Sequence, residues 1–296
     1  MSATPKVYLN GEILDADAAR ISPFERGFMW GDGIYEVTPC FGGRPYRLED
    51  HIDRLYRSLR YVRIDVGFGP DQMRSETERM LEANGDLLES APQFRIGHWV
   101  TRGGDPFVPA HLAEGPPTVF IYLQKVETGS TVRNLETGVR LSVTTTRRNP
   151  PECIETRAKV TSKMNQLLAE LDAGARDALS LMLDLDGNVS ENSVANFFIA
   201  RDGVLWTAPE RNILEGVTRK VVFELCERLS IPVEERLFTM YDVAQADEFF
   251  ITSSGVCAMP VSAVDDFLPR HPVPGPLTER LIEAFAADTG LDFRTL

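Results

Sequence analysis

One stretch near the middle of the chain organises the rest: Lys159-Val160-Thr161-Ser162-Lys163-Met164-Asn165-Gln166-Leu167-Leu168-Ala169. It predicts a helix after Ser162, a candidate N-cap, because apolar residues recur at helical spacing at Met164, Leu167, Leu168 and Leu171. If that apolar stripe packs on the protein, Lys163 falls on the opposite, solvated face of the helix. Lys159 precedes the helix, where the backbone can hold a lysine in a fixed and partly desolvated position.

A lysine held in that way can form a Schiff base with an aldehyde cofactor, because desolvation depresses the pKa of its amine. A candidate partner is Glu191, which follows the turn signal Asp186-Gly187 and precedes an apolar run. We expect Glu191 to enter the interior, where a buried carboxylate needs a partner. A protonated pyridine nitrogen is one such partner, and an arginine or a backbone N–H group is the simpler alternative. A lysine before a helix is also, in most proteins, ordinary surface charge.

The composition predicts a globular protein without a basic surface. The chain has 296 residues, of which 43% are hydrophobic and 25% charged, and 44 acidic residues outnumber 31 basic ones to give a net charge of −13. Nucleic acids and anionic membranes bind basic surfaces, so neither is an expected partner. We also expect no membrane span, because no apolar stretch is long enough.

The four cysteines are widely separated, at Cys40, Cys153, Cys226 and Cys257. They form no CxxC pair and no cluster with histidine, so we expect neither disulfides nor a metal site. The N-terminal residues carry no apolar run typical of a signal peptide. These features together favour a cytoplasmic protein.

The order of predicted elements indicates an α+β (α/β) chain with two domains. Strands and two helices fill residues 1–124, a polar stretch at 125–138 is the predicted linker, and residues 139–296 form the second domain. In the first domain, leucines and isoleucine at helical spacing predict a helix: Leu48, Ile52, Leu55 and Leu59. Glycines at 27, 31 and 33 indicate sharp bends beside bulky groups.

Three places are candidates for binding a phosphate. A helix after Gly216 would present the amides of Val217 and Thr218 and the hydroxyl of Thr218. Ser254 follows a strand and could supply a hydroxyl, and Arg54 could reach a phosphate from the first domain. The alternatives are a simple threonine cap, an ordinary turn and a solvated helix face.

This combination resembles the fold-type IV pyridoxal-phosphate enzymes, which include branched-chain aminotransferases, D-amino acid aminotransferases, (R)-selective amine transaminases and aminodeoxychorismate lyase. The resemblance runs from about residue 6 to 285 and is carried by these segments: 25–36, 51–55, 159–169, 187–197, 216–219 and 246–250. It implies a homodimer in which a small α+β N-terminal domain and a larger domain with a barrel-like sheet flank the active site.

By that resemblance Lys159 forms the Schiff base with pyridoxal 5′-phosphate and moves a proton during catalysis, and Glu191 pairs with the pyridine nitrogen. The phosphate would be held by Arg54, Val217, Thr218 and Ser254, with Tyr35 over the substrate site. The implied activity is ping-pong transfer of an amino group from an amino acid or primary amine to a keto acid. Further candidates for the substrate pocket are Trp30, Arg102, Phe107, Gly255 and Val256, with Met29 and Met259; core packing is the alternative for the apolar ones.

The chain departs from each branch of this family. The D-amino acid enzymes follow an Arg-Gly pair with Arg-x-His, but Arg102-Gly103 is followed here by 104–111 with no arginine. The branched-chain enzymes place a tyrosine where this chain has Met164, while residues 147–151 resemble the (R)-amine transaminases. Two rival functions stay open: a lyase that forms aminobenzoate, for which Thr38 is one indication, and a non-catalytic protein that binds pyridoxal phosphate or phosphate.

Overall fold

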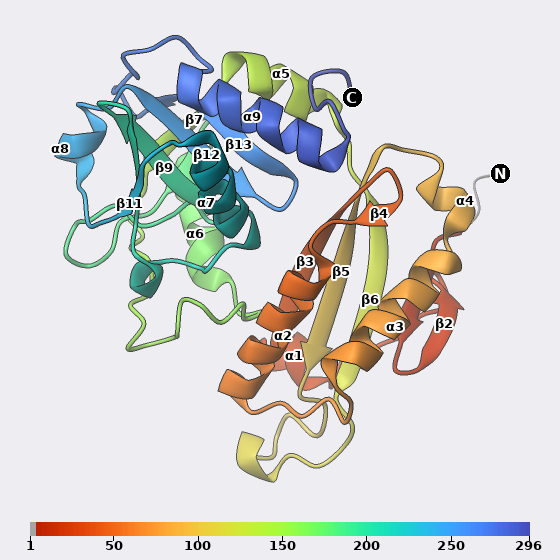
Figure 1. The fold of residues 1–296 in the computed structure, drawn as a ribbon. Helices are drawn as coiled ribbons and strands as arrows, with labels where there is room; N and C mark the ends of the chain where they lie inside the picture. Colours follow the sequence, from red (N-terminus) through yellow and green to blue (C-terminus); the bar gives the residue numbers. More distant parts are fainter. Residues whose placement is uncertain (1–3) are drawn as a thin grey trace. The chain divides into compact units, whose positions relative to one another are not determined.

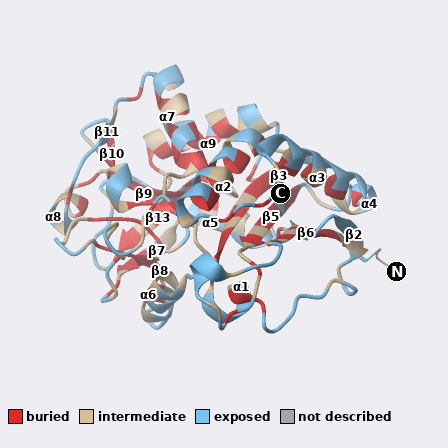
Figure 2. Ribbon diagram, turned by 90° about the horizontal axis from the view of Figure 1, so that it is seen from below, coloured by how far each residue is buried: buried red, intermediate tan, exposed pale blue. Residues whose placement is uncertain are grey.

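The computed structural model describes residues 4–296, which form two compact units. The first unit comprises Met1–Val126 with Ala158–Ser162, and the second comprises Glu127–Arg157 with Lys163–Leu296. Most of the strands in both units are buried, as the red ribbons of Figure 2 show.

The first unit contains a six-stranded antiparallel sheet in the order β2-β1-β6-β5-β3-β4. Its strands are β1 (Lys6–Leu9), β2 (Glu12–Asp15), β3 (Gly33–Phe41), β4 (Arg44–Pro45), β5 (Gln93–Thr101) and β6 (Thr118–Lys125). The hairpin predicted at Asn10-Gly11 joins β1 to β2, where both residues have a positive φ.

Two long helices of this unit, α2 (Leu48–Val62) and α3 (Pro70–Glu82), pack against the same sheet (Figure 1). Proline opens α3, and α2 carries Glu49 and Asp50 in its first turn, where the helix dipole favours negative charge. Shorter helical segments complete the unit: α1 (Arg26–Trp30), α4 (Gly85–Leu88) and the 3-10 turn η1 (Ala110–Leu112).

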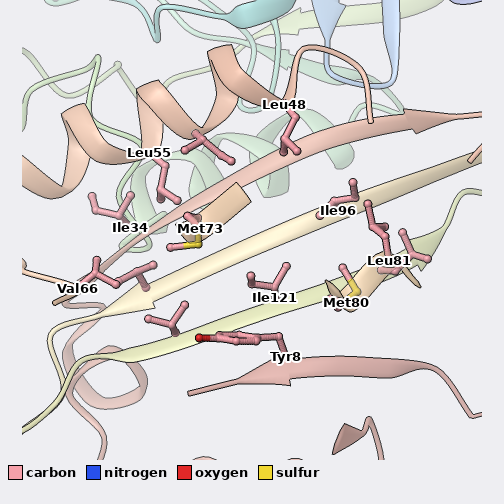
Figure 3. Close-up of a cluster of buried hydrophobic side chains, with 14 of the residues drawn as sticks. Tyr8, Ile34, Leu48, Leu55, Val66, Met73, Met80, Leu81, Ile96 and Ile121 are labelled. Atoms are coloured by element: carbon pink, nitrogen blue, oxygen red, sulfur yellow. The ribbon is translucent and has the colours of Figure 1, made fainter. Parts of the chain in front are cut away.

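The core of the first unit lies between these helices and the sheet (Figure 3). The predicted stripe of α2, which includes Leu48 and Leu55, packs there with Ile34 of β3 and Ile96 of β5. Because strand side chains alternate between two faces, the odd-numbered residues of β3 point away from this core. The second face of the sheet therefore carries Tyr35 and, on the neighbouring strands, Trp99 and Tyr122.

The second unit contains a seven-stranded mixed sheet in the order β11-β10-β9-β12-β13-β7-β8. Its strands are β7 (Val139–Val143), β8 (Leu179–Leu181), β9 (Asn196–Arg201), β10 (Val204–Thr207), β11 (Val233–Glu235), β12 (Glu248–Ser253) and β13 (Val256–Val264). Buried phenylalanines line the central strands on both faces, and Phe198 of β9 stacks on Phe250 of β12 with ring centroids 4.8 Å apart.

Helices α5 (Gly129–Thr137), α7 (Val217–Leu229) and α9 (Pro276–Thr289) pack on β12 and β13, while α6 (Met164–Gly174) packs on β7 and β8 (Figure 1). Two short segments, the 3-10 turn η2 (Glu210–Asn212) and helix α8 (Met240–Val243), lie in the connections. Both units mix helices with a sheet, which confirms the predicted α+β class.

The two units differ from the predicted domain limits in two respects. Residues 129–137, predicted to belong to a linker, form α5, which packs on β13. Ala158–Ser162, predicted to belong to the second domain, groups with the first unit because its backbone is bonded to β3. Sequence composition could not predict the packing of α5 on β13 or the bonding of residues 158–162 to β3, because both are contacts between segments far apart in the chain.

Helix α6 buries a different face from the predicted one. The residues of its apolar stripe are exposed by these fractions: Met164 65%, Leu167 44%, Leu168 49% and Leu171 72%. The buried residues are instead Ala169 and Ala173, because small side chains allow the helix to approach β8 closely. The N-cap is Lys163 rather than Ser162, and Lys163 is half-buried, so the predicted position of Lys163 on a solvated helix face was wrong.

Within residues 4–296, none of the helices combines the length and apolar composition needed to cross a membrane. The same residues contain no group of three or more His, Cys, Asp or Glu side chains arranged to hold a metal ion. Cys40, Cys153, Cys226 and Cys257 are all free thiols.

Candidate active site

The backbone of Lys159 is fixed by hydrogen bonds to β3 and α2. Its carbonyl accepts from Tyr35 N at 3.0 Å, and its own N–H donates to Ser58 Oγ at 3.2 Å. Two residues on, Thr161 N donates to Gly33 O at 2.9 Å, so that Val160 bridges Ile34. The predicted loop lysine is therefore held along the start of β3 as if it belonged to a short additional strand.

The side chain of Lys159 is half-buried and lies over an aromatic ring. Its Nζ is 4.6 Å from the centroid of the Tyr35 ring, a cation–π distance. This placement agrees with the expectation that Lys159 is fixed and partly desolvated. It also brings together Lys159 and Tyr35, which the sequence analysis placed in one site.

Aromatic rings continue from Tyr35 across the sheet face that the helices leave uncovered. Ring centroids lie 5.0 Å apart between Tyr35 and Trp99, 5.4 Å apart between Trp99 and Tyr122, and 5.4 Å apart between Tyr122 and Phe120. We call these four residues the aromatic row. Trp99, Tyr122 and Phe120 were not predicted as site residues, because the alternation within one strand does not tell which strands pair.

A pocket of about 600 Å³ lies in the first unit at the far end of the aromatic row. Its lining is mostly apolar, and the residues are Ile21, Ser22, Pro23, Glu25, Gly27, Phe28, Trp99, Thr101, Thr118, Phe120, Tyr122 and Thr161. Thr161 is two residues from Lys159, so the pocket begins close to the lysine along the chain. No lysine or arginine lines this pocket among residues 4–296, which makes it suited to an apolar group.

The three glycines predicted to pack beside bulky groups do pack closely, but their nearest neighbours are small side chains and backbone atoms. A Cβ at Gly27 would lie 2.2 Å from Thr101 Cγ2, and one at Gly33 would lie 2.8 Å from the Val100 carbonyl oxygen. Gly31 ends α1 with φ 63° and lies against Ser162. Only glycine fits these positions, so the loop before β3 can pack against both β5 and the segment that carries Lys159.

In the second unit, Glu191 is buried and accepts three hydrogen bonds. Oε1 accepts from Arg148 Nε at 2.9 Å, and Oε2 accepts from Asn196 Nδ2 at 3.0 Å and from Leu214 N at 2.9 Å. Its exposed fraction is 5%, as expected for a residue that leads into the interior. The arginine and the backbone N–H that the sequence analysis gave as simpler partners are both present.

Asn196 joins Glu191 to the start of α7. Its Nδ2 also donates to Leu214 O at 2.9 Å. A Cβ added to Gly216 would lie only 2.2 Å from Asn196 Oδ1, so Asn196 packs directly against Gly216. Gly216 is the N-cap of α7 and has no side chain that could accept a cap hydrogen bond. The amides of Val217 and Thr218 therefore start the helix without a side-chain cap. An N-terminus of this kind attracts anions, and the missed residue Asn196 fixes it relative to Glu191.

Of the other phosphate candidates, Ser254 lies in the turn between β12 and β13, with Gly255 beside it and Val256 opening β13. Arg54, in the first unit, is not on a solvated helix face: it is 3% exposed and ion-paired with Glu36. The predicted alternative for Arg54, a solvated helix face, was therefore wrong. A buried arginine needs a carboxylate partner, and Glu36 provides one.

The remaining substrate candidates lie around α1 and the loop after β5. Trp30 is 58% exposed and its Nε1 donates to Pro106 O, while Phe107 is 72% exposed. Arg102 pairs with Asp32 through Nε and Nη2 at 2.9 and 3.0 Å and also donates to the Val62 and Arg63 carbonyls. These contacts favour a structural role for Arg102.

Comparison with known proteins identifies the family. Residues 33–264 match the model of the amino-transferase class IV family. The chain is 33% identical over 285 residues to a putative branched-chain-amino-acid aminotransferase of Methanocaldococcus jannaschii, covering 95% of both chains. It is 29% identical over 283 residues to the D-alanine aminotransferase of Bacillus licheniformis, covering 93% of this chain and 94% of that one.

Solved structures agree. The fold matches the T.th. branched-chain amino acid aminotransferase complexed with N-(5′-phosphopyridoxyl)-L-glutamate, with a TM-score of 0.88, 26% identity and coverage of 97% and 95% of the two chains. The enzyme of Thermoproteus uzoniensis with norvaline gives a TM-score of 0.86 at 27% identity and the same coverage. The chain belongs to the class IV aminotransferase family, with the fold-type IV architecture that the resemblance implied. It is an aminotransferase that depends on pyridoxal 5′-phosphate.

The residues present fit this cofactor. The first unit offers a fixed amine at Lys159, and the second offers a buried carboxylate at Glu191 and an uncapped helix N-terminus at Val217 and Thr218. Gly216 is needed at that N-terminus, where any side chain would displace Asn196. When bound, the cofactor supplies an aldehyde for the amine and a ring that withdraws electrons from the reacting carbon.

Proposed function

We propose that Lys159 is the lysine that bonds the cofactor. Glu191 pairs with the pyridine nitrogen, and Arg54, Val217, Thr218 and Ser254 hold the phosphate. The observation that supports this most is the backbone of Lys159, which is bonded on both sides, to Tyr35 and to Ser58. A catalytic amine must be positioned within a fraction of an ångström, and Lys159 has the anchoring for it.

Glu191 has room for one more hydrogen-bond donor. Arg148, Asn196 and the Leu214 N–H all donate to it. A carboxylate has about four acceptor sites, and residues 4–296 use three of those of Glu191. The fourth site would accept from a protonated pyridine nitrogen and so sustain the electron-withdrawing ring.

We propose a ping-pong transamination in which the amino donor carries an apolar side group. The largely apolar pocket that Thr161 helps to line supports this substrate class, since no lysine or arginine among residues 4–296 lines it to bind a second carboxylate. The relative of Methanocaldococcus jannaschii, named for branched-chain amino acids, supports the same class. The D-alanine relatives and the (R)-amine transaminases leave the handedness of the donor open.

We do not favour an aminobenzoate-forming lyase, because Thr38, its one indication, does not face the proposed substrate site. Thr38 is fully buried, on the helix-covered face of β3 that also carries Ile34 and Glu36. It therefore lies on the opposite face of that strand from Tyr35, and it cannot contact a substrate bound there.

We also propose a homodimer in the cytoplasm. The apolar stripe of α6, which comprises Met164, Leu167, Leu168 and Leu171, is exposed in one copy of the chain and is suited to burial against a second copy. The four free thiols fit a reducing compartment.

Single-turnover reactions of the purified holoenzyme test the substrate class. The donors are L-leucine, D-alanine, (R)-1-phenylethylamine and L-glutamate, and the change in cofactor absorbance is followed for each. We expect conversion to be fastest with the donor that has a large apolar group of the accepted hand. Conversion by glutamate alone would contradict the proposed substrate class, and no cofactor absorbance after reconstitution would contradict the proposed function as a whole.

A further inference from the structure

A buried polar cluster lies between β3 and α2 in the first unit, and the site described above accounts for only one of its members. Glu36 of β3 is 0% exposed, and it faces His51 and Arg54 of α2, which are 1% and 3% exposed. His51 and Arg54 are three residues apart, so they share one face of the helix. Most neighbours on that side of the sheet are leucine and isoleucine, so an ionic cluster there needs a reason.

The cluster is organised around the Glu36 carboxylate. Oε2 accepts from Arg54 Nε at 2.8 Å, and Oε1 accepts from Arg54 Nη2 at 2.6 Å and from His51 Nδ1 at 3.0 Å. Burial by itself raises the pKa of Glu36, but the charge of Arg54 and the hydrogen bond from His51 outweigh it and hold the pKa well below its ordinary value. Glu36 is therefore ionised, and His51 must carry its proton on Nδ1.

The same helix face leads to the reactive lysine. Ser58, one turn beyond Arg54, is the residue whose hydroxyl accepts from the Lys159 backbone N–H. Burial is the main cause that lowers the pKa of His51, and the charges of Arg54 and then Lys159 lower it further. One face of α2 thus connects Glu36, Arg54 and Lys159 within one unit.

The pairing fixes the orientation of the Arg54 guanidinium. Bidentate bonds along the Nε–Nη2 edge allow one planar arrangement, which sets the direction in which the third nitrogen, Nη1, points. A buried arginine without this carboxylate would have to turn toward another acceptor, since an unpaired buried charge is costly.

We propose that Glu36 is a positioning residue that holds Arg54 in the orientation in which it binds the cofactor phosphate. This inference rests on the proposed function, which assigns the phosphate to Arg54. Glu36 touches neither the phosphate nor the reacting atoms. Its effect is specific to the phosphate, because the rest of the cofactor has no group that Arg54 is proposed to bind.

The test compares pyridoxal 5′-phosphate with pyridoxal, which lacks the phosphate, by titrating the cofactor-free protein and following fluorescence quenching. In the Glu36→Gln variant, an NH₂ group replaces one of the two carboxylate oxygens. That group cannot accept a hydrogen bond, so one of the two bonds from Arg54 is lost. We expect affinity for pyridoxal phosphate to fall by about tenfold or more, the value of one charge-assisted hydrogen bond. Affinity for pyridoxal should stay that of the wild type.

Two further variants complete the test. Arg54→Lys should lose the preference for the phosphorylated form, and adding Glu36→Gln to Arg54→Lys should cost little more, because Glu36 acts through Arg54. If Glu36→Gln does not fold, Glu36→Asp gives the same comparison, since its shorter side chain must draw Arg54 out of position.

Wild-type affinity of Glu36→Gln for pyridoxal phosphate, or an equal loss for both ligands, would overturn the positioning role while leaving the proposed function intact. Failure of the wild-type protein to prefer pyridoxal phosphate over pyridoxal would overturn the proposed function instead.

Discussion

At the scale of single residues, Gly97 determines the shape of the aromatic row. It pairs with Tyr122 across β5 and β6, and a Cβ there would lie 2.3 Å from the Tyr122 ring and 2.8 Å from the Trp99 ring. The missing side chain lets Tyr122 lie flat over the strand and in contact with Trp99. The aromatic row thus depends on a glycine as well as on its aromatic residues.

Gly97→Ala is expected to push the Tyr122 ring into the pocket. Overpacking of this kind costs about 2 kcal/mol of the free energy of unfolding, and the narrowed pocket should raise KM for donors with large apolar groups. Urea denaturation and steady-state kinetics measure the two effects. Gly174→Ala is the control, because a Cβ there meets nothing within 4 Å. Equal stability and equal KM in both variants would show that Tyr122 has room to move.

The key residues were predicted unevenly, for a physical reason. Lys159 and Glu191 could be proposed because each lies in a segment with a local signal, a loop before a helix and a turn before an apolar run. Glu36, Asn196 and Trp99 carry no local signal. They matter because of what lies across the sheet or on the facing helix, and that information depends on strand pairing.

At the scale of elements, α2 and α6 show when hydrophobic periodicity can be interpreted. The stripe of α2 is buried, as predicted, because a sheet lies beneath it. The stripe of α6 has the same spacing but is exposed, because two alanines on the other side face β8. Periodicity predicts that a helix forms and that it has an apolar face, but it does not tell whether that face meets its own chain or another.

The exposed stripe of α6 therefore leads to a prediction about assembly. Leu171→Glu keeps a good helix former at an exposed position, so the fold should be unchanged, while a charge in the proposed interface should weaken the dimer. Light scattering should give about twice 33.0 kDa for the wild type and a mass that falls toward 33.0 kDa on dilution of the variant. Leu268→Glu, at a leucine that is 66% exposed in the second unit, serves as the matched control. A dimer that is equally stable in both variants would exclude α6 from the interface.

At the scale of the whole molecule, the chain divides its chemistry between two units. The first holds Lys159, Arg54 and the aromatic row, and the second holds Glu191 and the start of α7. The order of residues alone suggested that Lys159 belongs with the later elements, because α6 follows it directly. Hydrogen bonds to β3 place the lysine in the first unit instead.

Each unit has its own internal support for its proposed site residues, from the Glu36 cluster in the first unit and from Asn196 in the second. The central claim is that the cofactor bonds Lys159, rather than the neighbouring Lys163, which is also half-buried.

Reduction of the holoenzyme with borohydride tests that claim most directly, since it makes the bond between cofactor and lysine permanent. Mass spectrometry of the digested protein, with fragmentation that separates the two lysines, then locates the added phosphopyridoxyl group. We predict that it lies on Lys159 and that Lys163 is unmodified. The same group found on Lys163, or on any lysine other than Lys159, would contradict the account.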